Sequence, residues 1–161
     1  LAVRLKDTDV RFTIIGDGSA RESLIKLIEE KEVSDKFTLI GRQPAERVPE
    51  LLAEADVALI AYASDPIYDL YIPAKLQSYM ACGMPLIALA AGETKRVIEE
   101  ADCGYCVKPG DLDAAEKAIR ELRDLSSEAL QNLGQKALEY NEKNFSKEKL
   151  MDQLEAILTA E

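Results

Sequence analysis

The chain alternates short apolar runs with segments of helical periodicity. Five runs lack the polar alternation of a half-exposed strand: residues 10–15, 37–40, 57–61, 85–89 and 104–107. Apolar runs of this length are typical of parallel strands that are buried on both faces. We therefore predict five parallel strands, each followed by a helical segment.

The intervening segments place apolar residues three and four positions apart, as an amphipathic helix requires. These residues are Leu24, Leu27 and Ile28; Val48, Leu51, Leu52 and Ala55; Leu76, Tyr79 and Met80; and Val97, Ile98 and Ala101. Asp111 is placed to cap a further helix, and two more helices follow, one ending near Asn144 and one over residues 146–159. The pattern predicts an α/β fold with a doubly wound, Rossmann-like parallel sheet and a helical C-terminal tail.

Length and charge narrow the classes of function. The 161 residues suit a single domain, and we take residues 1–161 as one fragment of a longer protein, because the sequence opens at Leu1 within a polar run. A net charge of −10 disfavours nucleic acid as a partner. No apolar run has the roughly 20 residues that span a bilayer, so we expect a cytoplasmic protein.

Ligands of such sheets bind beyond the carboxyl ends of the strands. Four segments follow strands there: residues 16–19, 41–44, 62–72 and 90–94. In the first segment, Gly16 and Gly18 permit close backbone approach, and the next helix points its free N–H groups at the turn. An anion site and a plain tight turn both explain this motif, and we leave the two open.

The segment from Tyr62 to Ile72 is a long polar and aromatic loop that ends at a helix start. Pro73 suits the first turn of that helix, where Ala74, Lys75 and Leu76 present amide N–H groups together with one ammonium group. This combination favours a diphosphate ligand, and Lys75 is the leading binding residue. The alternative is a lysine on a solvated helix face.

Several chemistries are set aside. Without histidine there is no His-based triad or His-ligated metal, so we expect no metal and no cofactor. The two Asp-x-Asp matches, at Asp7 and at Asp111, precede a strand and cap a helix, so we interpret both as structural. Cys103 and Cys106 have the spacing of a redox pair, but Cys103 flanks a short strand and Cys106 lies within it, whereas a redox pair follows a strand and opens a helix.

The sequence resembles the C-terminal, donor-binding domain of group 1 (family four) glycosyltransferases of the GT-B fold. The resemblance rests on IIGDGSARESL, FTLIGRQP, ELLAEADVALIAY, KLQSYMACGMPLIAL and ADCGYCVKPGDLDAAEKAI, in this order. It covers nearly the whole chain, and the segment around Pro73 is similar to transferases that build bacterial surface polysaccharides. It implies that one half of a retaining glycosyltransferase binds a nucleoside diphosphate sugar, with UDP as the favoured nucleotide.

The resemblance also assigns roles to residues. It implies that Gly16, Asp17 and Gly18 lie near the donor and that Arg42 and Gln43 hold the base. It places the diphosphate at the helix start, which comprises Pro73, Ala74, Lys75 and Leu76. No catalytic residue is assigned.

Two departures from the family pattern stand out. Leu70 and Ser78 occupy the positions of two family glutamates, and Ser78 retains only a neutral hydrogen bond for the ribose. The family's first strand, with the arginine and lysine that neutralise the diphosphate, would lie before Leu1. Its absence predicts a gap in the sheet, a borrowed strand, or an exposed edge prone to self-association.

The implied partners are a nucleotide sugar, the chain's own N-terminal domain, and an acceptor glycan or lipid-linked glycan at the inner membrane face. A degenerate, non-catalytic module and a sugar-nucleotide epimerase domain are the alternative functions, since fold alone does not choose between them. Tyr62, Tyr68 and Tyr71 either stack on a base or sugar, or cover the sheet edge.

Overall fold

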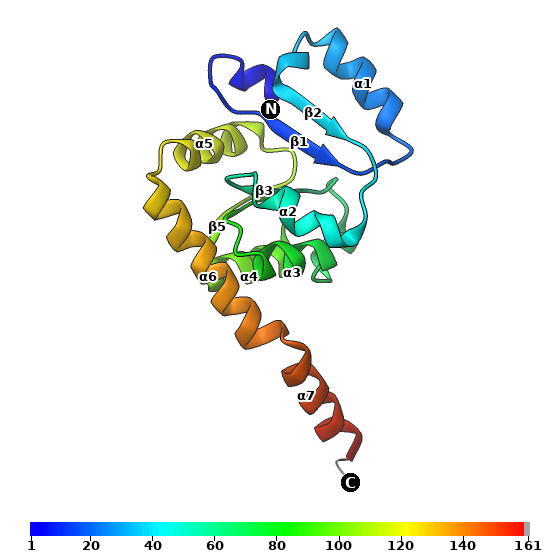
Figure 1. Cartoon of the computed structure of the whole chain (residues 1–161), viewed down its shortest axis with the longest axis vertical. Coiled ribbons are helices and arrows are strands. Elements are labelled where there is room, and N and C mark those ends of the chain that lie inside the picture. Colours follow the sequence, from blue (N-terminus) through cyan, green and yellow to red (C-terminus); the bar gives the residue numbers. More distant parts are fainter. Residues whose placement is uncertain (160–161) are drawn as a thin grey trace.

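The structure is a computed structural model that describes residues 1–159, and it has strands and helices in alternation (Figure 1). The strands are β1 (Phe12–Ile15), β2 (Phe37–Ile40), β3 (Ala58–Ala61), β4 (Leu86–Leu89) and β5 (Gly104–Val107). The α-helices are α1 (Arg21–Glu30), α2 (Val48–Leu52), α3 (Ala74–Ala81), α4 (Gly92–Ala101), α5 (Leu112–Arg123), α6 (Ser127–Phe145) and α7 (Lys147–Thr159). The predicted α/β fold with a helical C-terminal tail is confirmed.

The sheet is divided into two parts within the described residues. β1 pairs with β2 in parallel, with Phe12 beside Phe37, while β3, β4 and β5 form a separate three-stranded parallel sheet with β4 in the middle. The predicted parallel pairing is present in both parts. A divided sheet is one of the three outcomes expected from the resemblance, beside a borrowed strand and an exposed edge.

The larger sheet owes its core to β4, whose four residues are all buried. Leu86 and Ala88 pack in one cluster with Leu76 and Met80 of α3 and with residues of α4 and α6. Ile87 packs in a second cluster with Ile119 and other residues of α5. Because neighbouring strand residues point to opposite faces, both faces of β4 are covered by helices.

The smaller sheet is covered less well. The Phe12 and Phe37 rings stack with their centroids 5.4 Å apart, beside a small cluster that contains Ile28 and Val33. Thr13 and Ile14 are exposed, so the expectation that this strand is buried on both faces was wrong. The physical reason is that β1 has a paired strand on one side only.

The segment before β1 connects the smaller sheet to α5. The 3₁₀ helix η1 (Ala2–Leu5) buries Leu5 completely in the cluster beneath α5. Arg120 pairs with Asp7 at 2.8 Å, and Arg123 pairs with Asp9 at 2.5 Å. These pairs confirm the structural role predicted for the first Asp-x-Asp match.

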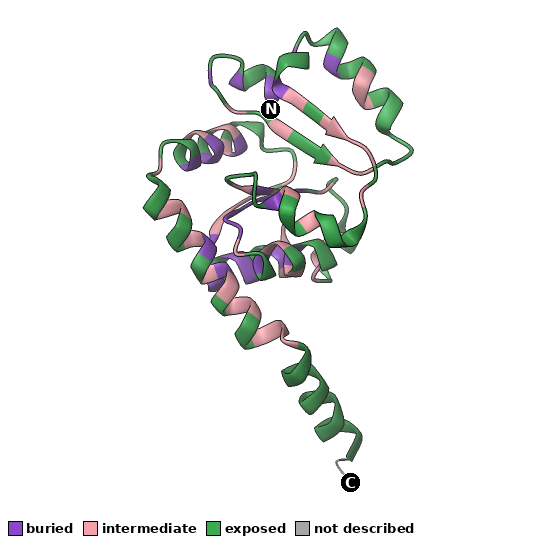
Figure 2. Cartoon of the chain, viewed as in Figure 1, coloured by how far each residue is buried: buried purple, intermediate pink, exposed green. Residues whose placement is uncertain are grey.

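The C-terminal helices behave differently from each other. A Cβ on Gly134 of α6 would lie 2.1 Å from the carbonyl oxygen of Gly83, so α6 meets the end of α3 at a very close approach. α7, in contrast, is exposed along its length and projects from the body (Figure 2). The two helix boundaries predicted at residues 144 and 146 are confirmed to within one residue.

Candidate functional site

The long loop between β3 and α3 is an ordered structure. The Asp65 carboxylate accepts a hydrogen bond of 3.0 Å from the Ile67 N–H and so starts the 3₁₀ helix η4 (Pro66–Asp69). The backbone of Asp69 then lies against Gly92, the first residue of α4, where a Cβ would be 2.1 Å from the Asp69 carbonyl oxygen. Gly92 also has a φ of +55°, so this contact requires glycine.

Three tyrosines of this loop form an aromatic cluster. The rings of Tyr62 and Tyr68 are nearly parallel, with centroids 4.7 Å apart, and Tyr71 is tilted against Tyr68 at 6.2 Å. Burial, with smaller contributions from the neighbouring tyrosines, raises the pKa of Tyr62. The sequence leaves the role of these rings open, and the length of the loop is its only signal for such a cluster.

The ammonium group of Lys75 belongs to the same cluster. Its Nζ lies over the Tyr62 ring, 4.6 Å from the centroid. Desolvation lowers the pKa of Lys75. Ion pairs within residues 1–159 do not include Lys75, so no carboxylate of the described chain neutralises its charge.

The first turn of α3 differs in one respect from the sequence prediction. Pro73 is the N-cap rather than a helical residue, and its carbonyl accepts a hydrogen bond of 3.0 Å from the Leu76 N–H. Leu76 is fully buried in the core. Leu76 is therefore a structural residue with an engaged amide, and Ala74 and Lys75 are the exposed residues of this turn.

The other predicted residues gather at the end of the smaller sheet. The Gly16 N–H donates to the Ile40 carbonyl at 3.0 Å, which joins the Gly16–Gly18 turn to the segment with Arg42 and Gln43. Asp17 pairs with Arg21 at 3.8 Å and is exposed, as is Arg42. The structure thus brings the predicted residues together as two groups, one at the end of each sheet.

Both positions of the family glutamates are exposed. The Leu70 side chain is 79% exposed. The Ser78 hydroxyl donates a hydrogen bond of 3.0 Å to the Ala74 carbonyl, within α3 itself. The lone pairs of the Ser78 hydroxyl oxygen remain able to accept a hydrogen bond. This matches the one neutral hydrogen bond to a ribose that the sequence leaves for Ser78.

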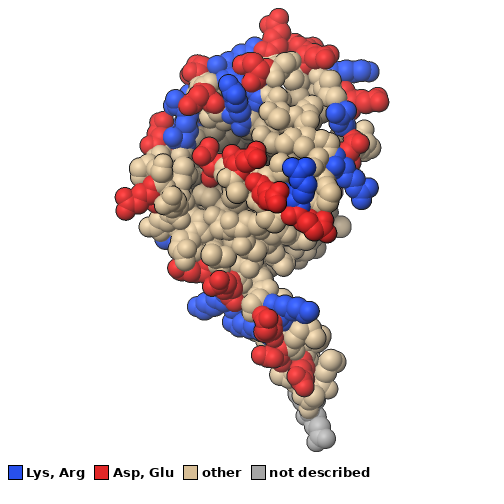
Figure 3. Space-filling view, viewed as in Figure 1, with Lys and Arg blue, Asp and Glu red and all other residues tan. Residues whose placement is uncertain are grey.

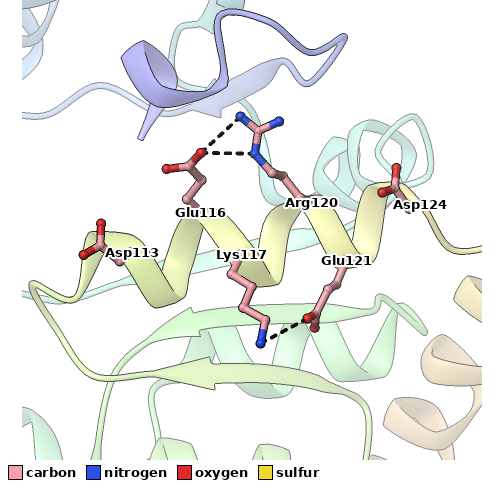
Figure 4. Close-up of a pocket in the computed structure, with 6 residues that line it drawn as sticks. All are labelled: Asp113, Glu116, Lys117, Arg120, Glu121 and Asp124. Carbon is pink, nitrogen blue, oxygen red and sulfur yellow. Dashed lines mark hydrogen bonds and ion pairs between the residues drawn. The ribbon is translucent and has the colours of Figure 1, made fainter.

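Two surface hollows of the described chain lie away from these residues. One, of about 330 Å³, follows the outer face of α5 and is lined by Asp113, Glu116, Lys117, Arg120, Glu121 and Asp124 (Figure 4). Four acidic and two basic side chains line it, which makes it unsuited to a phosphate. The other lies on α1, around Leu24 and Leu27.

The charge distribution agrees with the need for a local anion site. Figure 3 shows Lys and Arg atoms next to Asp and Glu atoms on the face that it draws, with no broad basic area. A phosphate group would therefore be held by a few groups, such as one ammonium and adjacent backbone amides, rather than by a long-range field.

The remaining motifs have structural roles. The Asp111 carboxylate accepts a hydrogen bond of 3.0 Å from the Ala114 N–H and caps α5, as predicted. Burial raises the pKa of Cys103 to about 12 and that of Cys106 to about 11. Such thiols carry little of the thiolate that redox chemistry requires.

The comparisons with known proteins identify the family of this chain. The sequence model of the family "Glycosyl transferases group 1" matches residues 1–140, and the chain belongs to this family. The match agrees with the resemblance found in the sequence. Within residues 1–159, no helix has both the length and the apolar character that crossing a membrane requires.

Curated relatives are longer proteins. The N-acetyl-alpha-D-glucosaminyl L-malate synthase of Bacillus anthracis is 30% identical over 94% of this chain and 38% of its own length. The probable glycosyltransferase WbjE of Pseudomonas aeruginosa is 28% identical over 85% of this chain and 34% of its own length. The chain therefore spans between a third and two fifths of these relatives.

Solved structures share the fold. Anabaena Alr3699/HepE, crystallised in complex with UDP-glucose, superposes with a TM-score of 0.79 at 20% identity, over 99% of this chain and 44% of that one. S. aureus TarM, in a complex that contains UDP, superposes with a TM-score of 0.80 at 19% identity, over 99% and 31%. Identities at this level establish the shared fold.

Proposed function

We propose that this chain binds the nucleoside diphosphate sugar donor of a retaining glycosyltransferase. The observation that carries the proposal is the Lys75 ammonium, which no carboxylate of the described chain neutralises, at the first turn of α3. A helix N-terminus with an adjacent cation suits a diphosphate, because amide N–H groups and the charge both face the anion. Family membership makes glycosyl transfer the relevant reaction and disfavours the epimerase alternative.

In this proposal the chain contributes electrostatic stabilisation of the leaving diphosphate. Lys75 and the amides of Ala74 and Lys75 would hold the negative charge that develops when the bond to the sugar breaks. Arg42 and Gln43 would hold the base, with Gly16, Asp17 and Gly18 near the donor. UDP is the favoured nucleotide, and structural neighbours crystallised with UDP support this choice.

The acceptor would bind to a second, N-terminal domain of the full protein. We propose a glycan or a lipid-linked glycan as the acceptor, in the biosynthesis of a bacterial polysaccharide at the inner face of the membrane. A radiolabelled sugar transferred from UDP-sugar to a lipid-extractable product by the full protein would support this. Transfer to water-soluble acceptors alone would contradict the lipid-linked acceptor.

We further propose that one additional strand of the full protein fills the space between β1 and β3. In a parallel sheet, alternate residues bond to opposite neighbours. Because the Gly16 N–H bonds to β2 and the Tyr62 N–H bonds to β4, the amides of Thr13, Ile15, Leu59 and Ala61 point to the other sides of their strands. Slower hydrogen exchange at these four amides in the full protein than in this chain is the expected result, and equal exchange would contradict it.

Leu70 and Ser78 stand where the family has two glutamates, and this loss of two carboxylates favours a second candidate function. In it, the chain is a degenerate module that assembles with another transferase. A charge-assisted hydrogen bond is about twice as strong as a neutral one, so the loss of two glutamates weakens donor binding. This candidate predicts that even the full protein binds no nucleotide.

The test is a ligand-detected NMR screen of this chain at low salt. UDP, GDP, ADP and dTDP are compared, with uridine and NAD as controls. Selective binding of one nucleoside diphosphate, with UDP expected, supports a donor site and names the base. Absence of binding to this chain and to the full protein would contradict the proposal and favour the degenerate module.

A further inference from the structure

The ammonium group of Lys75 is held against an aromatic ring of the loop, that of Tyr62. A lysine side chain has four rotatable bonds, and at a helix start it normally samples many positions in solvent. Here its Nζ lies 4.6 Å from the centre of the Tyr62 ring, within the roughly 6 Å at which a cation is attracted to the face of an aromatic ring. The ring provides a position for the ammonium without removing its charge.

Tyr62 is itself fixed by three kinds of contact. Its N–H donates to the Leu89 carbonyl at 3.1 Å, so its backbone continues the β3–β4 ladder. Its side chain packs against the main core cluster, and Tyr68 stacks on it at 4.7 Å with an interplanar angle of 5°. A ring held in this way limits the positions that the flexible Lys75 side chain samples.

The same stack argues against direct use of Tyr62 by a base. A nucleobase that stacks on Tyr62 needs an open ring face, but Tyr68 and the Lys75 ammonium already lie within 5 Å of the Tyr62 centroid. Tyr68 and the Lys75 ammonium therefore compete with a ligand base for the Tyr62 ring. The anionic part of a donor, in contrast, approaches Lys75 without disturbing the rings.

We propose that Tyr62 is a positioning residue, which acts through Lys75 and sets where the ammonium meets the donor diphosphate. Tyr68 supports it by holding the Tyr62 ring. The proposal rests on the proposed function, because it requires that Lys75 binds the diphosphate. It adds that the ring face of Tyr62, and not its hydroxyl, places the Lys75 ammonium, while the charge of Lys75 discriminates UDP from uridine.

The experiment compares UDP and uridine binding by calorimetry or NMR for the unaltered chain, Tyr62→Phe, Tyr62→Leu, Lys75→Met and the double variant Tyr62→Leu/Lys75→Met. Tyr62→Phe keeps the ring face and should bind UDP within about twofold of the unaltered chain. Tyr62→Leu should weaken UDP binding about 3- to 10-fold, the range of a partly desolvated cation–ring contact, and leave uridine binding unchanged. In the Lys75→Met background, Tyr62→Leu should have no further effect on UDP.

Failure of this inference and failure of the proposed function give different results. If Lys75→Met leaves UDP binding unchanged, the proposed function is wrong. If Lys75→Met weakens UDP binding but Tyr62→Leu does not, only the positioning role is wrong. Equal losses for UDP and uridine in Tyr62→Leu would instead show that the ring stacks on the base, and would overturn the inference.

A structural measurement accompanies the binding data. The ε-methylene protons of Lys75 should have an upfield ring-current shift in the unaltered chain and in Tyr62→Phe, and this shift should be lost in Tyr62→Leu. Tyr68→Leu removes the support but keeps the Tyr62 ring, so it provides a second test if Tyr62→Leu does not fold. It should weaken UDP binding less than Tyr62→Leu does, and a larger loss for uridine than for UDP would contradict the inference.

Discussion

The two parallel sheets differ in how much they bury. β4 has a strand on each side and helices over both faces, and all four of its residues are buried. β1 has one neighbouring strand, and its Thr13 and Ile14 are exposed. The sequences FTII of β1 and LIAL of β4 predict the same kind of strand, so burial is decided by the neighbours that the fold supplies.

The difference extends to the candidate site. The β3–β5 half contains the Tyr62 cluster and Lys75, which contact one another, and the loop between them is held against Gly92 through the backbone of Asp69. The β1–β2 half contains Gly16 and Arg42 on less buried elements. We therefore expect the diphosphate subsite to be the more rigid part of the site.

The largest expected effect is a difference in unfolding free energy between a substitution in β4 and one in β1. Leu86→Ala removes a fully buried side chain of β4 and should lower the free energy of unfolding by about 2–5 kcal/mol. Ile14→Ala is the matched control in β1, where the side chain is already 36% exposed, and should cost about 1 kcal/mol or less. Urea unfolding measures both, and equal losses would contradict the comparison.

The next effect concerns the loop that carries the tyrosines. Gly92→Ala should lower the free energy of unfolding by about 1–3 kcal/mol, because the new Cβ meets the Asp69 backbone and φ is positive. It should also displace the loop and weaken UDP binding. Gly41→Ala is the control, since a Cβ there has no atom within 4 Å, and its stability should change little. A Gly92→Ala variant as stable as Gly41→Ala would show that the loop is not fixed by this contact.

A smaller effect is expected from acid. Hydrogen bonds from Arg120 and Arg123 hold the pKa values of Asp7 and Asp9 below their usual 3.8. A lowered folded-state pKa stabilises the fold above the unfolded value and loses this contribution as pH falls below it. The contacts between the η1 segment and α5 should therefore weaken below about pH 3.8, with faster amide exchange in β1 and β2 than in β4.

The smallest expected effect comes from a substitution that weakens the contact between the η1 segment and α5 at neutral pH. Arg120→Met removes the pairs with Asp7 and Glu116 and should raise amide exchange rates in β1 and β2 only. Lys117→Met is the control, because Lys117 pairs with Glu121 on the exposed face of the same helix. Equal changes in both variants, or a change centred on β4, would contradict the role given to Arg120.

Sequence patterns were sufficient for the elements of the fold. The strand positions, the Asp111 cap and the final two helices all follow from local periodicity and capping, which act over a few residues. The division of the sheet and the exposure of Thr13 depend on which strands are neighbours, and periodicity does not contain that information. The resemblance to a family offered a gap in the sheet as one of three outcomes, and the strand that it implies before Leu1 stays a prediction.

The candidate site was predictable in part. The helix start at Pro73 and the charge of Lys75 follow from residue type and position. The contact between Lys75 and Tyr62 joins residues thirteen positions apart across an irregular loop, so no periodic pattern predicts it. The engaged Leu76 amide was also missed, because the N-cap position of Pro73 depends on the exact residue at which α3 begins.

If the first turn of α3 binds a diphosphate, as we propose, the substitution Lys75→Ala removes the ammonium group on which this binding depends. UDP and uridine binding are measured side by side for the unaltered chain and the variant. We expect UDP binding to fall about 10-fold or more, the loss expected for one charged hydrogen bond, and uridine binding to be unchanged. Equal effects on UDP and uridine, or no effect on either, would contradict this proposal.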